Sequence, residues 1–272
     1  MKNQENRKVD DNEKKCRIKA VAFTHCGKVR EKNEDNLIFS GNVLDKEHTR
    51  MNGRLFQGRY TGKTVELFGV FDGMGGYSNG EEASWIAAET AREFLYDIRT
   101  AFEVQQLKEI CFQANKEVCR RMDEEHITMG TTASMICLKD KQLHICNIGD
   151  TPIFRMRDGK LESIFREHSQ RVFYEKVMGP EAVEGKHFPL TQCIGIRPEE
   201  MKISPYLDTL EWQEGDRYLI CSDGLTDMVF RKEIMAYMNA EHDLNVLGDT
   251  FLQAALENGG KDNITMILLE ML

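Results

Sequence analysis

The sequence lacks any long apolar segment. No stretch of the chain approaches the roughly 18 apolar residues that a membrane-spanning helix requires. The polar N-terminal segment MKNQENRKVDDNEKK has no apolar core of the kind found in signal peptides. We therefore predict a soluble, cytoplasmic protein with no membrane partner.

A surplus of positive charge is also missing. The chain has 45 aspartates and glutamates against 36 lysines and arginines, which gives a formal net charge of -9. The broad basic surface that proteins use to bind nucleic acid is therefore not expected, and we predict no nucleic-acid partner. The acidic excess is either solvated surface, which is the more common case, or it includes carboxylates that gather to bind cations.

Proline is scarce, and the cysteines lack a pairing pattern. Only five prolines occur, which argues against a collagen-like or low-complexity chain. The eight cysteines include no Cys-X-X-Cys pair, and several lie inside apolar runs. A set of reduced thiols that are mostly core residues is the better interpretation than a disulfide scaffold.

The composition that is present is typical of a soluble globular protein. Of the 272 residues, 41% are hydrophobic and 30% are charged. Residues 1–16 are polar and show no periodicity, so we predict a disordered tail there. No linker or repeat is evident in residues 17–272, which we predict to form one domain.

Short β-type runs dominate the predicted domain, and helical patterns interrupt them in pairs. Helix pairs among hairpin-connected strands predict an α+β layered sandwich rather than a parallel, doubly wound sheet. The first helix is expected to begin with a capping box formed by Ser78 and Glu81. The helices are predicted at residues 78–98, 104–122, 230–240 and 244–256, and the strands in IKAVAFT, NLIFS, VELFGVF, TASMICL, QLHICNI, PIFRM, RYLICS and NITMILLEML.

Acidic residues lie at the ends of three strongly apolar strands. Asp72 follows VELFGVF, Asp223 follows RYLICS, and Asp262 immediately precedes the last strand. Three carboxylates at strand ends in one core can converge, and a divalent cation offsets the cost of burying them. For each site taken alone, a simple strand-ending turn is the more common explanation, since Asp-Gly is frequent there.

A fourth acidic cluster combines carboxylates with a cation. Arg30 and Glu34 lie in the segment REKNEDN, just before an apolar strand. If Glu34 reaches the other carboxylates, the oxygen-only ligands favour Mg²⁺ or Mn²⁺ over Zn²⁺, and Arg30 is free to bind a phosphate. A surface salt bridge is the simpler alternative for Arg30. Gly73, after Asp72, lets the backbone approach an ion, and its carbonyl could be a ligand.

Six segments, taken in chain order, resemble the motifs of the metal-dependent protein phosphatases of the protein phosphatase 2C family, in their bacterial form. The resemblance covers about residues 17–272, and six motifs in the family's order are specific where one alone is not. The segments are GKVREKNEDN (27–36), FDGMGG (71–76), GTTA (130–133), IGD (148–150), CSDGLTD (221–227) and KDNIT (261–265).

The resemblance implies a fold and a metal centre. The expected fold is a four-layer α-β-β-α sandwich of two antiparallel sheets flanked by helix pairs, with two Mn²⁺ or Mg²⁺ ions at one edge. By the family's pattern, Asp72 bridges both ions. The other expected ligands are Asp223 and Asp262 for one ion, Glu34 and the Gly73 carbonyl for the other, Asp35 in support, and Asp150 and Asp227 with Asp223 for a third, weaker ion.

The resemblance also implies a reaction and its partners. Phosphoserine and phosphothreonine on proteins would be hydrolysed by a metal-activated water, with Arg30 binding the phosphate and with no covalent phosphoenzyme. Arg30, Asp72, Asp223 and Asp262 are the expected catalytic residues. The expected partners are phosphoproteins, including substrates of a serine/threonine kinase, and the chain is expected to be a monomer.

Three positions depart from the family's pattern. Met74 stands where some eukaryotic relatives have a histidine, so the general acid is unassigned, and Thr151-Pro152 replaces the usual Ser-Arg. Residues 167–193 correspond to the variable flap that influences substrate choice, and His168 within it is kept out of the catalytic set because a lone histidine is more often structural.

Two alternatives to a general phosphatase remain open. One is a pseudophosphatase that binds phosphoproteins without turnover, although such relatives usually lack a metal aspartate and this chain lacks none. The other is a partner-switching or sporulation-type phosphatase that acts on a single phosphoserine regulator. Those enzymes usually carry extra sensor or membrane domains, which this chain does not show.

Overall fold

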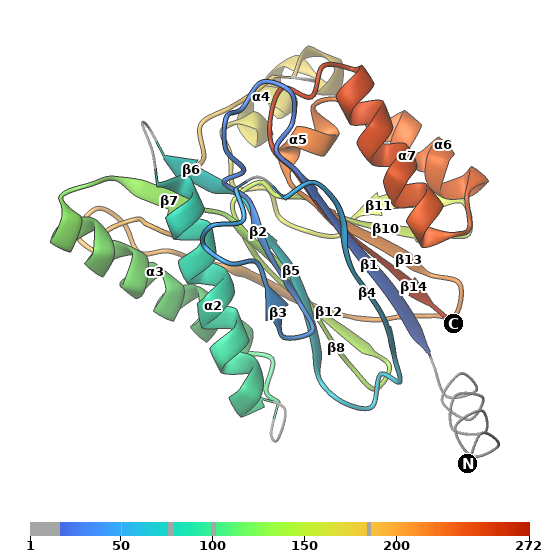
Figure 1. The fold of residues 1–272 in the computed structure, drawn as a ribbon, viewed down its shortest axis with the longest axis horizontal. Coiled ribbons are helices and arrows are strands. Elements are labelled where there is room, and N and C mark those ends of the chain that lie inside the picture. The colour runs from blue at the N-terminus through green and yellow to red at the C-terminus, as the bar shows by residue number, and fades with distance from the viewer. Residues whose placement is uncertain (1–16, 50, 76–78, 99–101, 184–185) are drawn as a thin grey trace.

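The computed structural model describes residues 17–49, 51–75, 79–98, 102–183 and 186–272 (Figure 1). The tail predicted at residues 1–16 and the predicted capping residue Ser78 lie outside these ranges. All strand pairs are antiparallel, and they form two six-stranded sheets and one small two-stranded sheet.

The first sheet holds both ends of the described chain. Its strand order is β11-β10-β13-β14-β1-β4, so the first and last long strands lie side by side with Ile18 opposite Met271. Its strands are β1 (Ile18–His25), β4 (Gly53–Tyr60), β10 (Ile153–Arg157), β11 (Lys160–Ser163), β13 (Arg217–Cys221) and β14 (Ile264–Met271).

The second sheet has the order β12-β9-β8-β5-β2-β3. Every residue of its central strand β5 is buried, which explains the continuous apolar run that precedes Asp72. Its strands are β2 (Asn36–Phe39), β3 (Asn42–Val43), β5 (Glu66–Phe71), β8 (Ala133–Lys139), β9 (Gln142–Ile148) and β12 (Tyr206–Glu211), and the small sheet pairs β6 (Gly73–Gly75) with β7 (Met129–Thr131).

Two helix pairs cover the outer faces of the sandwich (Figure 1). Helices α2 (Gly80–Ile98) and α3 (Gln106–Glu125) pack on the second sheet through one apolar cluster, while α6 (Arg231–Ala240) and α7 (Leu244–Glu257) pack on the first sheet through another. A third cluster fills the space between the sheets. The four-layer α-β-β-α architecture is therefore confirmed.

The element boundaries follow local sequence closely. The β8–β9 and β10–β11 connections are tight hairpins, and Asp140 (φ 56°) and Asp158 (φ 50°) adopt the left-handed backbone conformation that such turns need. The two long helices begin two residues later than predicted, at Gly80 and Gln106. The sequence did not predict the half-exposed edge strands β4 and β12 or helix α4 (Arg171–Met178).

The structure bears on two features considered from the sequence, namely membrane-spanning helices and the state of the cysteines. Within the described ranges, no helix combines the length and apolarity needed to cross a bilayer. The seven cysteines that the structure describes are free thiols, as predicted, and five of them are buried.

Candidate metal centre

Most of the predicted site residues line one cleft at the end of the sandwich. The cleft has a volume of about 660 Å³, and it lies where β5, β9, β13 and β14 end or begin. Both sheets contribute, so residues more than 200 positions apart in the sequence, such as Arg30 and Asp262, meet there. The predicted residues in its wall are Arg30, Glu34, Asp72, Gly73, Asp150, Asp223 and Asp262.

Asp72 is fixed by the backbone of the second sheet. Its amide donates to the Thr132 hydroxyl (3.0 Å), the Thr132 amide donates back to the Asp72 carbonyl (2.9 Å), and the Thr131 hydroxyl donates to that same carbonyl (2.9 Å). With its backbone held on both sides, the Asp72 carboxyl is free to face the cleft. The GTTA segment of the sequence therefore positions Asp72.

The loop that carries Arg30 and Glu34 is held by Asn263. The buried Asn263 amide group accepts from the Glu34 amide (2.8 Å) and donates to the carbonyls of Cys26 (2.9 Å) and Lys32 (2.8 Å). The Ser84 hydroxyl of α2 donates to the Glu34 carbonyl (2.6 Å). This loop is thus tied to β14 and to α2 at once, which places Glu34 beside Asp72.

Asp35 lies behind the cleft rather than in its wall. Its side chain is 1% exposed and accepts a hydrogen bond from the Ser222 hydroxyl (2.8 Å), while the Ser222 oxygen accepts from the Thr265 amide (2.9 Å). Ser222 immediately precedes Asp223. Asp35 therefore braces the β13 end that presents Asp223, which fits the supporting role expected for it.

Arg30 forms an ion pair with one of the predicted ligands. Its Nη2 lies 2.7 Å from Asp262 Oδ2, and its side chain is 53% exposed at the mouth of the cleft. The salt-bridge alternative considered for Arg30 is therefore observed, but with a cleft carboxylate rather than a surface one. In this position the guanidinium faces any anion that enters the cleft.

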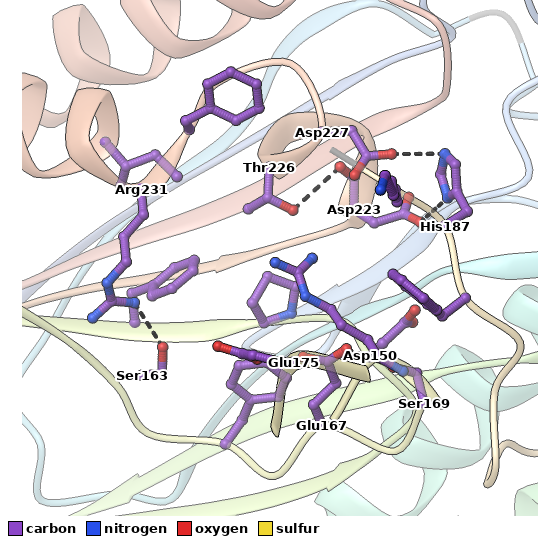
Figure 2. Close-up of a pocket in the computed structure, with 18 residues that line it drawn as sticks. Asp150, Ser163, Glu167, Ser169, Glu175, His187, Asp223, Thr226, Asp227 and Arg231 are labelled. Carbon is purple, nitrogen blue, oxygen red and sulfur yellow. Dashed lines mark hydrogen bonds and ion pairs between the residues drawn. The ribbon is translucent and has the colours of Figure 1, made fainter. Parts of the chain in front are cut away.

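Asp150, Asp223 and Asp227 line a second, smaller pocket of about 370 Å³ (Figure 2). The buried Thr151 hydroxyl contacts the Thr132 hydroxyl (2.6 Å), so the turn that carries Asp150 is joined to the strand that positions Asp72. Helix α5 (Asp223–Thr226) starts at Asp223, and the Asp227 amide donates to the Asp223 carbonyl (2.8 Å).

A histidine of the flap completes this pocket. His187 Nε2 lies 2.8 Å from Asp227 Oδ2, and His187 Nδ1 lies 3.7 Å from Asp223 Oδ2 (Figure 2). Candidate ligand atoms of these three residues all lie within 4.8 Å of one another. His187 was not predicted from the sequence, because a lone histidine in a variable segment has no spacing that marks it as a ligand.

The carboxylates of the cleft raise one another's pKa values. Burial, followed by the charges of Asp223 and Asp35, raises the pKa of Asp72 well above its usual value. Burial and the neighbouring Asp227 and Asp262 raise the pKa of Asp223 to about 6. Burial raises the pKa of Asp35 and of Asp150 to about 7. Burial also raises the pKa of Glu34.

This donor set fits divalent cations. Crowded, partly desolvated carboxylates are costly in isolation, and a cation that coordinates them directly offsets both the burial and the mutual repulsion. The carboxylates of Glu34, Asp72, Asp223 and Asp262 and the Gly73 carbonyl offer oxygen ligands in this cleft, which suits Mg²⁺ or Mn²⁺. The geometry can therefore hold metal ions next to an exposed arginine, as hydrolysis of a phosphate ester requires.

A family model described as protein phosphatase 2C matches residues 59–259. The chain belongs to the protein phosphatase 2C family. The match confirms the family predicted from the motifs, and with it the class of metal-dependent serine/threonine phosphatases. Within the family, the serine/threonine phosphatase stp of Listeria monocytogenes is 28% identical over 237 residues, which are 83% of this chain and 91% of that protein.

Solved structures of the family have the same fold. Stp1, a serine/threonine phosphatase from Staphylococcus aureus, matches with a TM-score of 0.78 and 26% identity, covering 93% of this chain and 94% of that one. The catalytic domain of the phosphatase PstP, solved in complex with two manganese ions, matches with a TM-score of 0.76 and 24% identity, covering 94% and 99%.

Two further residues support the candidate site of this protein phosphatase 2C chain. Asn263 positions the Glu34 loop, and its place in the KDNIT motif was the available signal. His168 is structural, as interpreted from sequence. Its Nδ1 accepts from the Gly149 amide (3.3 Å) and its own amide donates to the Gly149 carbonyl (2.9 Å), so it anchors the flap beside Asp150.

Proposed function

We propose that this chain hydrolyses phosphoserine and phosphothreonine esters on proteins, using the cleft around Asp72 as a two-metal active site. The observation that carries the proposal is the gathering of Asp72, Asp223, Asp262 and Glu34 around one cleft with Arg30 at its mouth. Family membership and the names of the relatives support the same activity.

Each predicted metal residue is assigned the role that its position supports. Asp72, fixed at the end of β5, would be a ligand of both ions. Asp223 and Asp262 complete the site on the side of the first sheet, while Glu34 and the Gly73 carbonyl complete the other side. Asp35 holds the Asp223 strand end through Ser222, and Asp150 and Asp227 with Asp223 bind a third, weaker ion.

The protein residues orient the phosphate and balance its charge. When bound, two divalent ions supply an activated water and neutralise the charge that develops on the phosphate. Asp262 would hold an ion, and the Arg30 guanidinium, which pairs with Asp262 in this structure, would then be free to bind two phosphate oxygens in parallel. The ester then loses its serine or threonine alcohol and yields inorganic phosphate.

A cysteine nucleophile is not needed for this reaction, and the structure offers poor ones. Cys193 lines the cleft, but burial raises the pKa of its thiol to about 11. Burial also raises the pKa of Cys26, which lies near Arg30. Both thiols are therefore protonated at neutral pH, and a thiol is a weak nucleophile compared with a thiolate.

The proposal extends to partners and compartment. The substrates are phosphoproteins, and we propose that they include targets of a serine/threonine kinase that the phosphatase opposes. The free thiols support a reducing compartment and hence the cytoplasm. We propose that the chain acts as a monomer, because the cleft is built from residues of one chain.

The first prediction tests metal dependence. Purified protein should release phosphate from a phosphothreonine peptide when Mn²⁺ or Mg²⁺ is added, should stop when a chelator removes the metal, and should recover when metal is restored. The measurement is released phosphate over time, with circular dichroism to show that the chelated protein is still folded.

The same assay separates the enzyme from a pseudophosphatase. A folded protein that binds the phosphopeptide but releases no phosphate with any of these metals would overturn the proposed catalysis. That result would make the phosphoprotein-binding interpretation the leading one.

The second prediction concerns Arg30. Replacing it with alanine should lower kcat/KM by about 10- to 50-fold, because a charged donor to the phosphate is lost from a partly exposed site. Arg30→Lys should recover only part of this loss, since a lysine cannot make the parallel pair of hydrogen bonds. Steady-state kinetics on the phosphothreonine peptide provide the measurement.

The matched control is Arg54→Ala. Arg54 lies on β4 and donates to Asn245 of α7 (2.9 Å), away from the cleft. It should leave kcat/KM unchanged. Equal kinetics for Arg30→Ala and Arg54→Ala would remove Arg30 from the phosphate-binding role.

A further inference from the structure

The flap carries His187 directly over two carboxylates that are proposed to bind the third ion. The Asp227 and Asp223 side chains are 14% and 28% exposed, whereas His187 is 66% exposed and approaches them from the solvent side (Figure 2). Three residues that can each donate one ligand atom thus converge, with all of these atoms within 4.8 Å of one another.

The flap around His187 is held by hydrogen bonds other than the His187–Asp227 contact. The segment that follows it is anchored elsewhere: Gln170 donates its amide to the Pro189 carbonyl (2.9 Å), and Thr191 donates its amide to the His168 carbonyl (2.8 Å). His168 is in turn held to Gly149, next to Asp150. The flap therefore presents His187 to the acidic pair through hydrogen bonds within the flap and through the contacts of His168 with Gly149.

We propose that His187 is a ligand of the third divalent ion, together with Asp223 and Asp227. The inference rests on the proposed function only in placing an ion at these two aspartates. An imidazole nitrogen added to carboxylate oxygens changes the chemistry of the site. Mn²⁺ also suits oxygen ligands, but as a transition ion it accepts an imidazole nitrogen more readily than Mg²⁺ does.

Two consequences distinguish this site from the rest of the metal centre. The third site should select Mn²⁺ over Mg²⁺ more strongly than the cleft around Asp72, where the ligands are oxygens. Binding of the ion should also join the flap to helix α5, because His187 belongs to the flap and Asp223 starts that helix. The alternative is that a charged His187 simply pairs with the two aspartates and leaves when a metal binds.

The decisive measurement is electron spin-echo envelope modulation (ESEEM) spectroscopy of Mn²⁺ bound to the protein, with one to three equivalents of Mn²⁺ added. A directly bound imidazole gives a nitrogen-14 coupling, while carboxylate, carbonyl and water oxygens give none. We expect this coupling in the wild-type protein and its loss in His187→Gln. The affinity of the variant for its most weakly bound Mn²⁺ should also fall by about 10- to 100-fold, the range seen when a supporting residue of a metal site is removed.

The matched control is His242→Gln, which alters an exposed histidine between α6 and α7 and should keep both the nitrogen coupling and the affinity. No nitrogen coupling in the wild type at any loading, or coupling that persists in His187→Gln, would overturn the proposal. Neither readout needs turnover. A protein that shows the coupling but releases no phosphate would contradict the proposed function and leave the His187 site standing.

Discussion

Replacing Asp223 with asparagine is expected to reduce metal-dependent phosphate release by about 10³-fold or more, which corresponds to about 4 kcal/mol in the barrier. Asp223 is proposed to bind two of the three ions, and its carboxyl lies among Asp227, Asp262 and Asp72. Asparagine keeps the size of the side chain and one oxygen but removes the charge that holds a divalent ion. The measurement is kcat on a phosphothreonine peptide at saturating Mn²⁺.

The fold should survive this change. Asp223 contributes its backbone carbonyl to helix α5, where the Asp227 amide donates to it, and asparagine keeps that carbonyl. Removing one of several mutually repelling carboxylates should leave the melting temperature of the chelated protein equal or higher. Added Mn²⁺ should then raise the melting temperature of the variant less than that of the wild type, because less metal binds to the native state.

Asp249→Asn is the matched control, since Asp249 is an exposed aspartate of α7 outside the cleft. It should match the wild type in both assays. Turnover of Asp223→Asn within tenfold of the wild type, at the same Mn²⁺ concentration, would show that Asp223 is not an essential ligand.

The strands that are buried along their whole length could be predicted from the sequence. β5 and β13 are buried at every position, so their continuous apolar runs were recognisable, and the acids that follow them were correctly expected to converge. β4 was missed because its residues alternate between partly and fully exposed and include two glycines. Its strand conformation comes from pairing with β1, and the local sequence of β4 does not predict that pairing.

The flap was the least predictable part of the site. Helix α4 is only eight residues long and has no buried residue, and its apolar side chains Val172, Phe173, Val177 and Met178 are exposed. So short an apolar segment does not by itself distinguish a helix from a strand or a loop. His187 lies 36 positions before Asp223, and only the folding of the flap against the turn at Gly149 brings the two together. Long-range contacts of this kind leave no periodic pattern in the chain, whereas strand-end aspartates do.

Gly73→Ala is expected to lower activity by about 10²-fold or more and to destabilise the fold by about 2 kcal/mol. A Cβ at this position would lie 2.3 Å from the Glu34 carbonyl oxygen and 2.3 Å from the Gly80 carbonyl oxygen. Neither oxygen can easily retreat. The Glu34 carbonyl accepts from Ser84, and Gly80 is the first residue of α2. The added methyl group must therefore push β6 away from the Glu34 loop.

That displacement would separate Asp72 from Glu34, the residues proposed to hold the second ion from opposite sides. Steady-state kinetics of Gly73→Ala measure the loss of activity, and thermal unfolding of the same variant measures the loss of stability. Gly159→Ala is the matched control, because Gly159 has a φ of 75° in the β10–β11 turn and its Cβ would meet nothing closer than 3.6 Å. It should lose about 1 kcal/mol of stability through backbone strain alone and keep full activity. Equal activity of the two variants would mean that the tight packing around Gly73 does not position the metal ligands.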